Sequence, residues 1–144
     1  MQIQKVQIIS DLLCYGPRPE PNDEVEQRLT ISSSGRIWFT RYSYGTGYGK
    51  YEVGRKKQLF IGKARAAKLL ELISSYIENN DICIVATDIG DWNMTAVDVV
   101  GKKYSKTGSM CGGVIARDID LTDYIRMAIL IEELTVFGGG YNMV

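Results

Sequence analysis

The spacing of apolar residues changes repeatedly along the chain, and this change restricts the possible folds more than any other feature. Between residues 25 and 33 side chains alternate, with Val25, Gln27, Leu29 and Ile31 on one side and only polar residues on the other. Between residues 63 and 79 the apolar positions follow a helical spacing instead: Ala66, Leu69, Leu70, Ile73 and Ile77. A period of two predicts a half-buried strand, and a period of 3.6 predicts an amphipathic helix. The chain should therefore contain both elements, each with one face to bury.

Turn residues divide the remaining segments into further strands. Ser32 to Gly35 separates the alternating stretch from an aromatic-rich run at 36–42, which predicts a hairpin over 25–44. We expect other strands at 2–13, 82–87, 92–100 and 103–110. All three prolines lie in the loop at 16–23, so the predicted elements contain none. Short connections of this kind favour antiparallel pairing.

A second helix is predicted from Leu121 to about Ile131. Asp120 precedes it as an N-cap, because its carboxylate can accept the free amides of Thr122 or Asp123. The chain has 144 residues, a common size for one domain. We expect a single α+β domain over residues 1–144, with an antiparallel sheet of about six strands and two amphipathic helices on one face. The element order is roughly βββαβββα.

Histidine is absent from the sequence, and this removes most familiar catalytic chemistry. Neither a Ser-His-Asp triad nor a Cys-His dyad nor a histidine-containing zinc site can be assembled. The three cysteines, Cys14, Cys83 and Cys111, form no CxxC pair and fit reduced thiols. We therefore assign no catalytic residue, no cofactor and no metal ligand, and expect a non-enzymatic protein. A small hydrolase or transferase would be limited to carboxylate, lysine, tyrosine or cysteine chemistry.

The glycine-rich string from Gly45 to Lys50 does not form a phosphate loop. A Walker A motif needs glycine where this chain has Tyr44, and Ser or Thr where it has Tyr51. The first residues lack the basic segment and apolar run of a signal peptide, and no apolar stretch approaches the roughly 20 residues of a membrane span. We expect a cytoplasmic protein without a membrane partner.

Charge is distributed unevenly, although the formal net charge is zero. Residues 1–34 carry a net charge of −2, residues 35–68 carry +8, and residues 69–144 carry −6. Clustered like charges create local potentials that the total conceals. The basic segment also contains a Tyr/Gly-rich hairpin tip at 42–51, and together these features suggest a contact surface. Its candidate partner-binding residues are Tyr42, Tyr44, Tyr48, Lys50, Tyr51, Arg55, Lys56, Lys57, Lys63 and Arg65.

Two hypotheses explain this surface. In the first, the chain is a small protein-binding or regulatory module, and the basic segment contacts an acidic protein surface or another copy of the chain. In the second, it binds single-stranded DNA or RNA, with Tyr44, Tyr48 and Tyr51 stacking on bases and the basic run 55–57 on phosphates. Both depend on whether folding leaves the basic segment exposed or brings it against the acidic parts.

Overall fold

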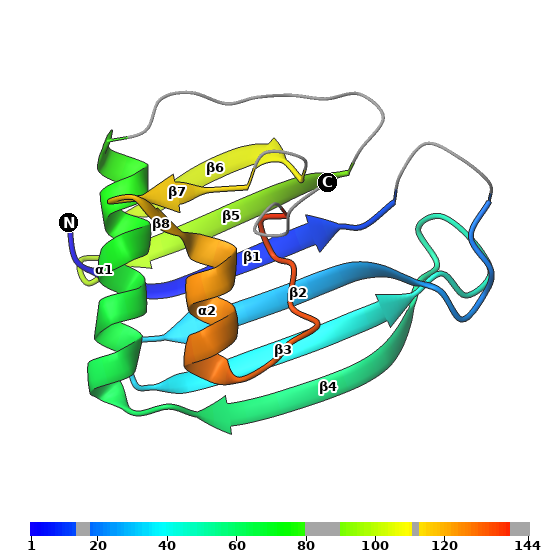
Figure 1. The fold of residues 1–144 in the computed structure, drawn as a ribbon, viewed down its shortest axis with the longest axis horizontal. Helices are drawn as coiled ribbons and strands as arrows, with labels where there is room; N and C mark the ends of the chain where they lie inside the picture. Colours follow the sequence, from blue (N-terminus) through cyan, green and yellow to red (C-terminus); the bar gives the residue numbers. More distant parts are fainter. Residues whose placement is uncertain (14–17, 80–89, 111–112, 139–144) are drawn as a thin grey trace.

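Six strands in the described part of the computed structural model, residues 1–13, 18–79, 90–110 and 113–138, form one antiparallel sheet (Figure 1). The spatial order is β4-β3-β2-β1-β5-β6. The strands are β1 (Ile3–Asp11), β2 (Glu24–Ser32), β3 (Arg36–Ser43), β4 (Glu52–Phe60), β5 (Asp91–Asp98) and β6 (Lys103–Ser109). Two helices, α1 (Lys63–Asn79) and α2 (Leu121–Ile129), lie on one face of this sheet, and a short ribbon of β7 (Ile115–Ala116) and β8 (Ile119–Asp120) precedes α2. The predicted α+β fold is confirmed.

Strand β4 differs from the expectation. Residues 52–60 were expected to be part of a loop and a basic stretch, but they form β4, which pairs with β3 along its whole length. Its sequence does not alternate because β4 is an edge strand, in which eight of nine residues are exposed and the other, Leu59, is partly buried. Pairing of the backbone with β3, and not burial of side chains, defines this strand. The strand expected at 82–87 lies outside the described residues.

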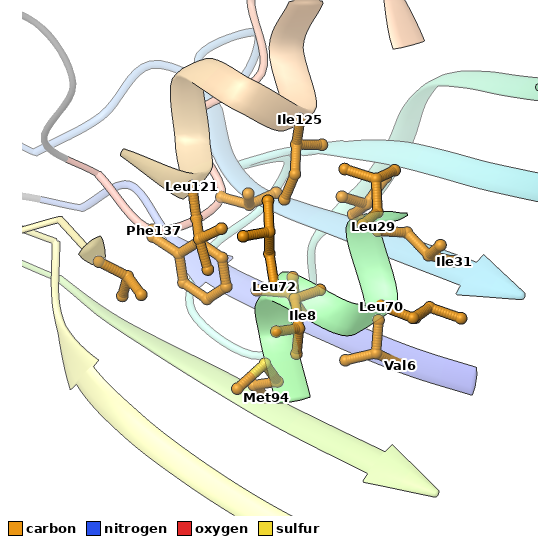
Figure 2. Packing of buried hydrophobic residues seen from close by; sticks show 14 of the residues in the cluster. Val6, Ile8, Leu29, Ile31, Leu70, Leu72, Met94, Leu121, Ile125 and Phe137 are labelled. Atoms are coloured by element: carbon orange, nitrogen blue, oxygen red, sulfur yellow. The ribbon is translucent and has the colours of Figure 1, made fainter. Parts of the chain in front are cut away.

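The core lies between the sheet and the two helices. Alternate residues of the central strands point toward the helices and are buried, among them Val6, Ile8, Leu29, Ile31, Ile37, Phe39, Met94 and Ala96. Figure 2 shows side chains from β1, β2, β5 and both helices meeting in this layer. All five apolar residues predicted for the face of α1 are buried. The Asp120 carboxylate accepts the Asp123 amide at 3.0 Å, as expected of an N-cap. No helix in the described ranges is long and apolar enough to cross a membrane.

Residues 131–138, called here the 131–138 strap, follow α2 across the same face of the sheet (Figure 1). Polar side chains on the sheet hold its backbone. The Gln27 side chain donates to the Glu133 carbonyl at 2.9 Å and accepts the Thr135 amide at 2.9 Å, while the Ser10 hydroxyl donates to the Val136 carbonyl. The strap backbone gives up hydrogen bonds with water where it packs on the sheet, and the buried Gln27 side chain replaces them.

Candidate functional site

The structure divides the ten predicted partner-binding residues into groups at different ends of β4. The tyrosines belong to the β3–β4 loop or the strand ends beside it, whereas Lys63 and Arg65 follow the far end of β4 in the first turn of α1. A nine-residue strand spans about 30 Å, so these two groups cannot share one small ligand. Arg55, Lys56 and Lys57 lie between them on the strand itself, and Lys50 is exposed in the loop.

The basic run on β4 occupies one edge of the sheet. Lys57 pairs with Phe39, Lys56 with Thr40 and Arg55 with Arg41, all on the β3 side. The opposite edge of β4 pairs with no other described strand, so its backbone amides and carbonyls face outward. Paired residues share a face of the sheet, which places Arg55 and Lys57 on the helix-covered face and Lys56 on the open face.

A pocket of about 250 Å³ lies beside this edge on the helix-covered face. It is lined by Phe39, Arg41, Arg55, Lys56, Lys57 and Glu133. A hydrogen bond from its own backbone amide and the charges of Arg41, Lys57 and Arg55 hold the pKa of Glu133 below its usual value. Three cationic side chains on this face, Arg41, Arg55 and Lys57, therefore surround a single carboxylate, which stays ionised.

Arg41 is not available to a partner, although it belongs to the basic segment. Its side chain is 5% exposed and forms ion pairs with Glu24 at 3.3 Å and with Glu133 at 3.1 Å. Arg55 shares Glu24 at 3.1 Å but is 67% exposed. Neither Lys56 nor Lys57 forms an ion pair with a described residue, so part of the positive charge remains uncompensated.

The tyrosines face a different environment, an open cleft of about 400 Å³ on the sheet face away from the helices. Its lining residues come from β1, β2, β3, β5 and the β3–β4 loop: Ile9, Asp11, Glu26, Arg28, Tyr42, Tyr48, Gly49, Tyr51, Asp91 and Asn93. The Tyr51 ring lies 6.1 Å from the rings of both Tyr44 and Tyr48. Tyr48 is 80% exposed at the rim. Tyr44 itself lines a separate, smaller pocket with the loop at 18–21.

The cleft is acidic, which the sequence did not predict. Burial raises the pKa of Asp11 above its ordinary value; the Leu13 amide opposes this shift, and the charges of Glu26 and Asp91 add to it. Burial and the nearby Asp11 carboxylate also raise the pKa of Tyr51. The one arginine in the cleft, Arg28, bonds Glu26 at 2.6 Å and lies 4.7 Å from the centre of the Tyr42 ring. Tyrosines and basic run therefore do not form one surface.

Metal binding finds no support in the described residues, because no three acidic, cysteine or histidine side chains there could together hold an ion. All three cysteines lie outside the described ranges. Asp118, Asp120 and Asp123 surround the start of α2, where Asp120 acts as the cap. Asp91, the first residue of β5, lines the cleft.

Replacing Asp11 with asparagine should stabilise the protein at neutral pH. The asparagine amide oxygen could still accept the Leu13 amide, which bonds Asp11 Oδ1 at 2.9 Å, but the variant would not place a charge beside Glu26 and Asp91. Because the folded-state pKa of Asp11 is raised, its ionisation opposes folding above that pKa. We expect a melting temperature a few degrees higher than wild type at pH 7, with the difference disappearing as the pH falls and Asp11 becomes protonated. Thermal melts of both proteins between neutral and acidic pH would measure this. A difference in melting temperature that stays constant with pH would contradict a raised pKa for Asp11.

No protein-family model matches the chain, and no curated protein is significantly similar to it. The site must therefore be interpreted from its own geometry.

Proposed function

We propose that the protein is a non-enzymatic, cytoplasmic binding module whose edge strand β4 accepts an acidic, extended segment of a partner protein. The unpaired outer edge of β4, with Arg55, Lys56 and Lys57 in succession, carries the proposal. An extended segment added to such an edge gains main-chain hydrogen bonds with β4. Its successive side chains then lie on alternate faces of the sheet.

The arrangement of charges favours an acidic segment. On one face a carboxylate from the added strand would meet Arg55, Lys57 and the 250 Å³ pocket, and on the other face it would meet Lys56. Charge-assisted hydrogen bonds of this kind are about twice as strong as neutral ones. The pocket wall formed by Phe39 adds an apolar surface for the stem of a glutamate side chain.

Self-association through β4 is less favourable. In the fully aligned antiparallel register, two copies of β4 would place Lys56 opposite Lys56 and Arg55 opposite Lys57, and like charges directly opposite destabilise a sheet. The other edge strand, β6, carries Lys103 and Lys106, so joining β4 to β6 would also oppose basic strands. Lysines on both edges protect the sheet against its own copies.

Nucleic-acid binding by these residues is less well supported. Two of the three tyrosines that would stack on bases, Tyr48 and Tyr51, line a cleft with Asp11, Glu26 and Asp91, whose carboxylates would repel phosphates. Only the basic run and the start of α1 remain for a backbone contact.

The test is an NMR titration of the whole chain with a synthetic peptide of alternating glutamate and valine. We expect saturable shifts in β4, slower hydrogen exchange of its outward amides, and affinity that falls with salt. The double variant Arg55→Gln/Lys57→Gln should weaken binding at least about tenfold, because two charge-assisted contacts are lost.

Lys103→Gln/Lys106→Gln is the matched control, since it removes two positive charges from the opposite edge. It should leave the affinity within about twofold of wild type. Equal loss in both double variants would indicate a non-specific charge effect and overturn the proposal. Tighter binding of single-stranded oligothymidylate than of the peptide, with the same sensitivity to Arg55→Gln/Lys57→Gln, would replace it with the nucleic-acid function.

A further inference from the structure

The cleft on the open sheet face has the dimensions and the floor of a small binding site. Its volume of about 400 Å³ lies within the range usual for ligand pockets. Register places Ile9 between Arg28 and Asn93, and the next pair along the strands is Asp11 and Glu26, with Tyr42 beside Glu26. Regular, hydrogen-bonded strands therefore fix the floor, while the β3–β4 loop supplies Tyr48 and Tyr51 as a wall.

The cleft already holds one organic cation of its own. The Arg28 guanidinium lies 4.7 Å from the centre of the Tyr42 ring and bonds Glu26 at 2.6 Å, so it combines an aromatic ring with a carboxylate. Tyr48 and Tyr51 offer two further rings, at an angle of 78° to one another. Perpendicular rings present an edge and a face to the same space, as aromatic sites for ammonium groups do.

The remaining charges leave room for a second cation. Arg28 compensates Glu26, but neither Asp11 nor Asp91 forms an ion pair with a residue in the described ranges. Burial is the main cause of the raised pKa of Asp11, and the nearby carboxylates of Glu26 and Asp91 add to it, so a cation placed here would offset a cluster of like charges. A bare metal ion does not suit the site, since no three carboxylates of the described residues are placed to hold one together. A larger cation with an apolar surface suits both the Tyr48 and Tyr51 rings and the volume of the cleft.

We infer that the cleft between Asp11, Asp91, Tyr48 and Tyr51 binds an alkylammonium group, from a free amine or from a lysine side chain. The ammonium would lie near Asp11 and Asp91, with its methylene groups against the tyrosine rings. This site lies on the opposite sheet face from the β4 pocket, so the two proposals are independent.

The test is an NMR titration of the full chain with two probes, spermidine and a short glycine-serine peptide containing one lysine. Sodium chloride at matched ionic strength serves as the blank. Saturable shifts at Tyr48, Tyr51 and Asn93 with either probe, and not with sodium, are the expected result. Tighter binding of spermidine would identify a free amine as the source, and tighter binding of the peptide would identify a protein side chain. Absence of saturation with both probes, or equal shifts with sodium, would overturn the inference.

Variants separate the contributions of ring and charge. Tyr48→Ala and Asp91→Asn should each weaken binding roughly threefold or more, whereas Tyr48→Phe, which keeps the ring, should bind like wild type. Glu132→Gln removes an exposed carboxylate elsewhere and should change nothing. Tyr48 and Asp91 are exposed, so their variants should fold, which the same spectra report. Binding that is indifferent to Tyr48→Ala, or that falls equally with Glu132→Gln, would refute an aromatic ammonium site.

Discussion

Replacing Phe137 with alanine is expected to lower the free energy of unfolding by about 3–5 kcal/mol. Phe137 is fully buried in the 131–138 strap, and its ring meets the Trp92 ring edge-on with centroids 4.9 Å apart. The substitution would open a cavity between the strap and β5 and remove this aromatic contact. Chemical denaturation monitored by Trp fluorescence would measure the loss, because Trp92 directly reports on the cavity.

Phe60→Ala provides the matched control for this change. Phe60 lies at the end of β4 and is 69% exposed, so the same truncation there should alter stability by no more than about 0.5 kcal/mol. If Phe137→Ala and Phe60→Ala cost the same, the strap would not be part of the core.

Gly138→Ala should destabilise the protein by about 3 kcal/mol or more, for a different reason. Gly138 has φ of +64°, and a Cβ there would overlap the carbonyl oxygen of Met110 and stand 2.5 Å from its carbonyl carbon. Both of these atoms belong to the backbone just after β6, so rotation of a side chain cannot relieve the overlap. The Gly138 carbonyl also accepts the Thr122 hydroxyl at 3.1 Å, and any shift of the strap would break this bond.

Gly49→Ala is the control that separates the strain of a positive φ from the steric overlap with the Met110 backbone. Gly49 has φ of +79°, but no atom of the described residues lies within 4 Å of its hypothetical Cβ. Conformational strain alone should therefore lower the stability of this variant, by about 1 kcal/mol. Denaturation curves for the two variants should therefore differ by about 2 kcal/mol or more. Equal curves would mean that strain alone explains both glycines.

The period of apolar residues was enough to predict the elements whose side chains are half buried. The hairpin of β2 and β3, the five buried positions of α1 and the cap of α2 are all present as expected. Strand β4 could not be predicted in this way, because burial imposes no pattern on an edge strand. The alternation places Gln27 on the buried side, but neither its partner nor the burial of Arg41 could be predicted, since each bonds to the 131–138 strap more than 90 residues further along the chain.

The site was predicted only in part for a related reason. A basic segment containing tyrosines was evident, but its two components belong to different surfaces, because the loop folds toward β1 and β5 while β4 extends along the edge. The acidic floor depends on β5 lying next to β1. That pairing brings Asp91 to Asp11, and local sequence patterns contain no information about it.

The 131–138 strap also affects how the chain folds during its synthesis. The Ser10 to Val136 hydrogen bond spans 126 residues and the Gln27 to Thr135 bond spans 108. Strands β1 to β3 therefore leave the ribosome roughly 5–20 s before the strap that covers their apolar face. During this interval the nascent β1–β3 meander lacks the hydrogen bonds and the apolar cover that the strap gives it in the finished protein.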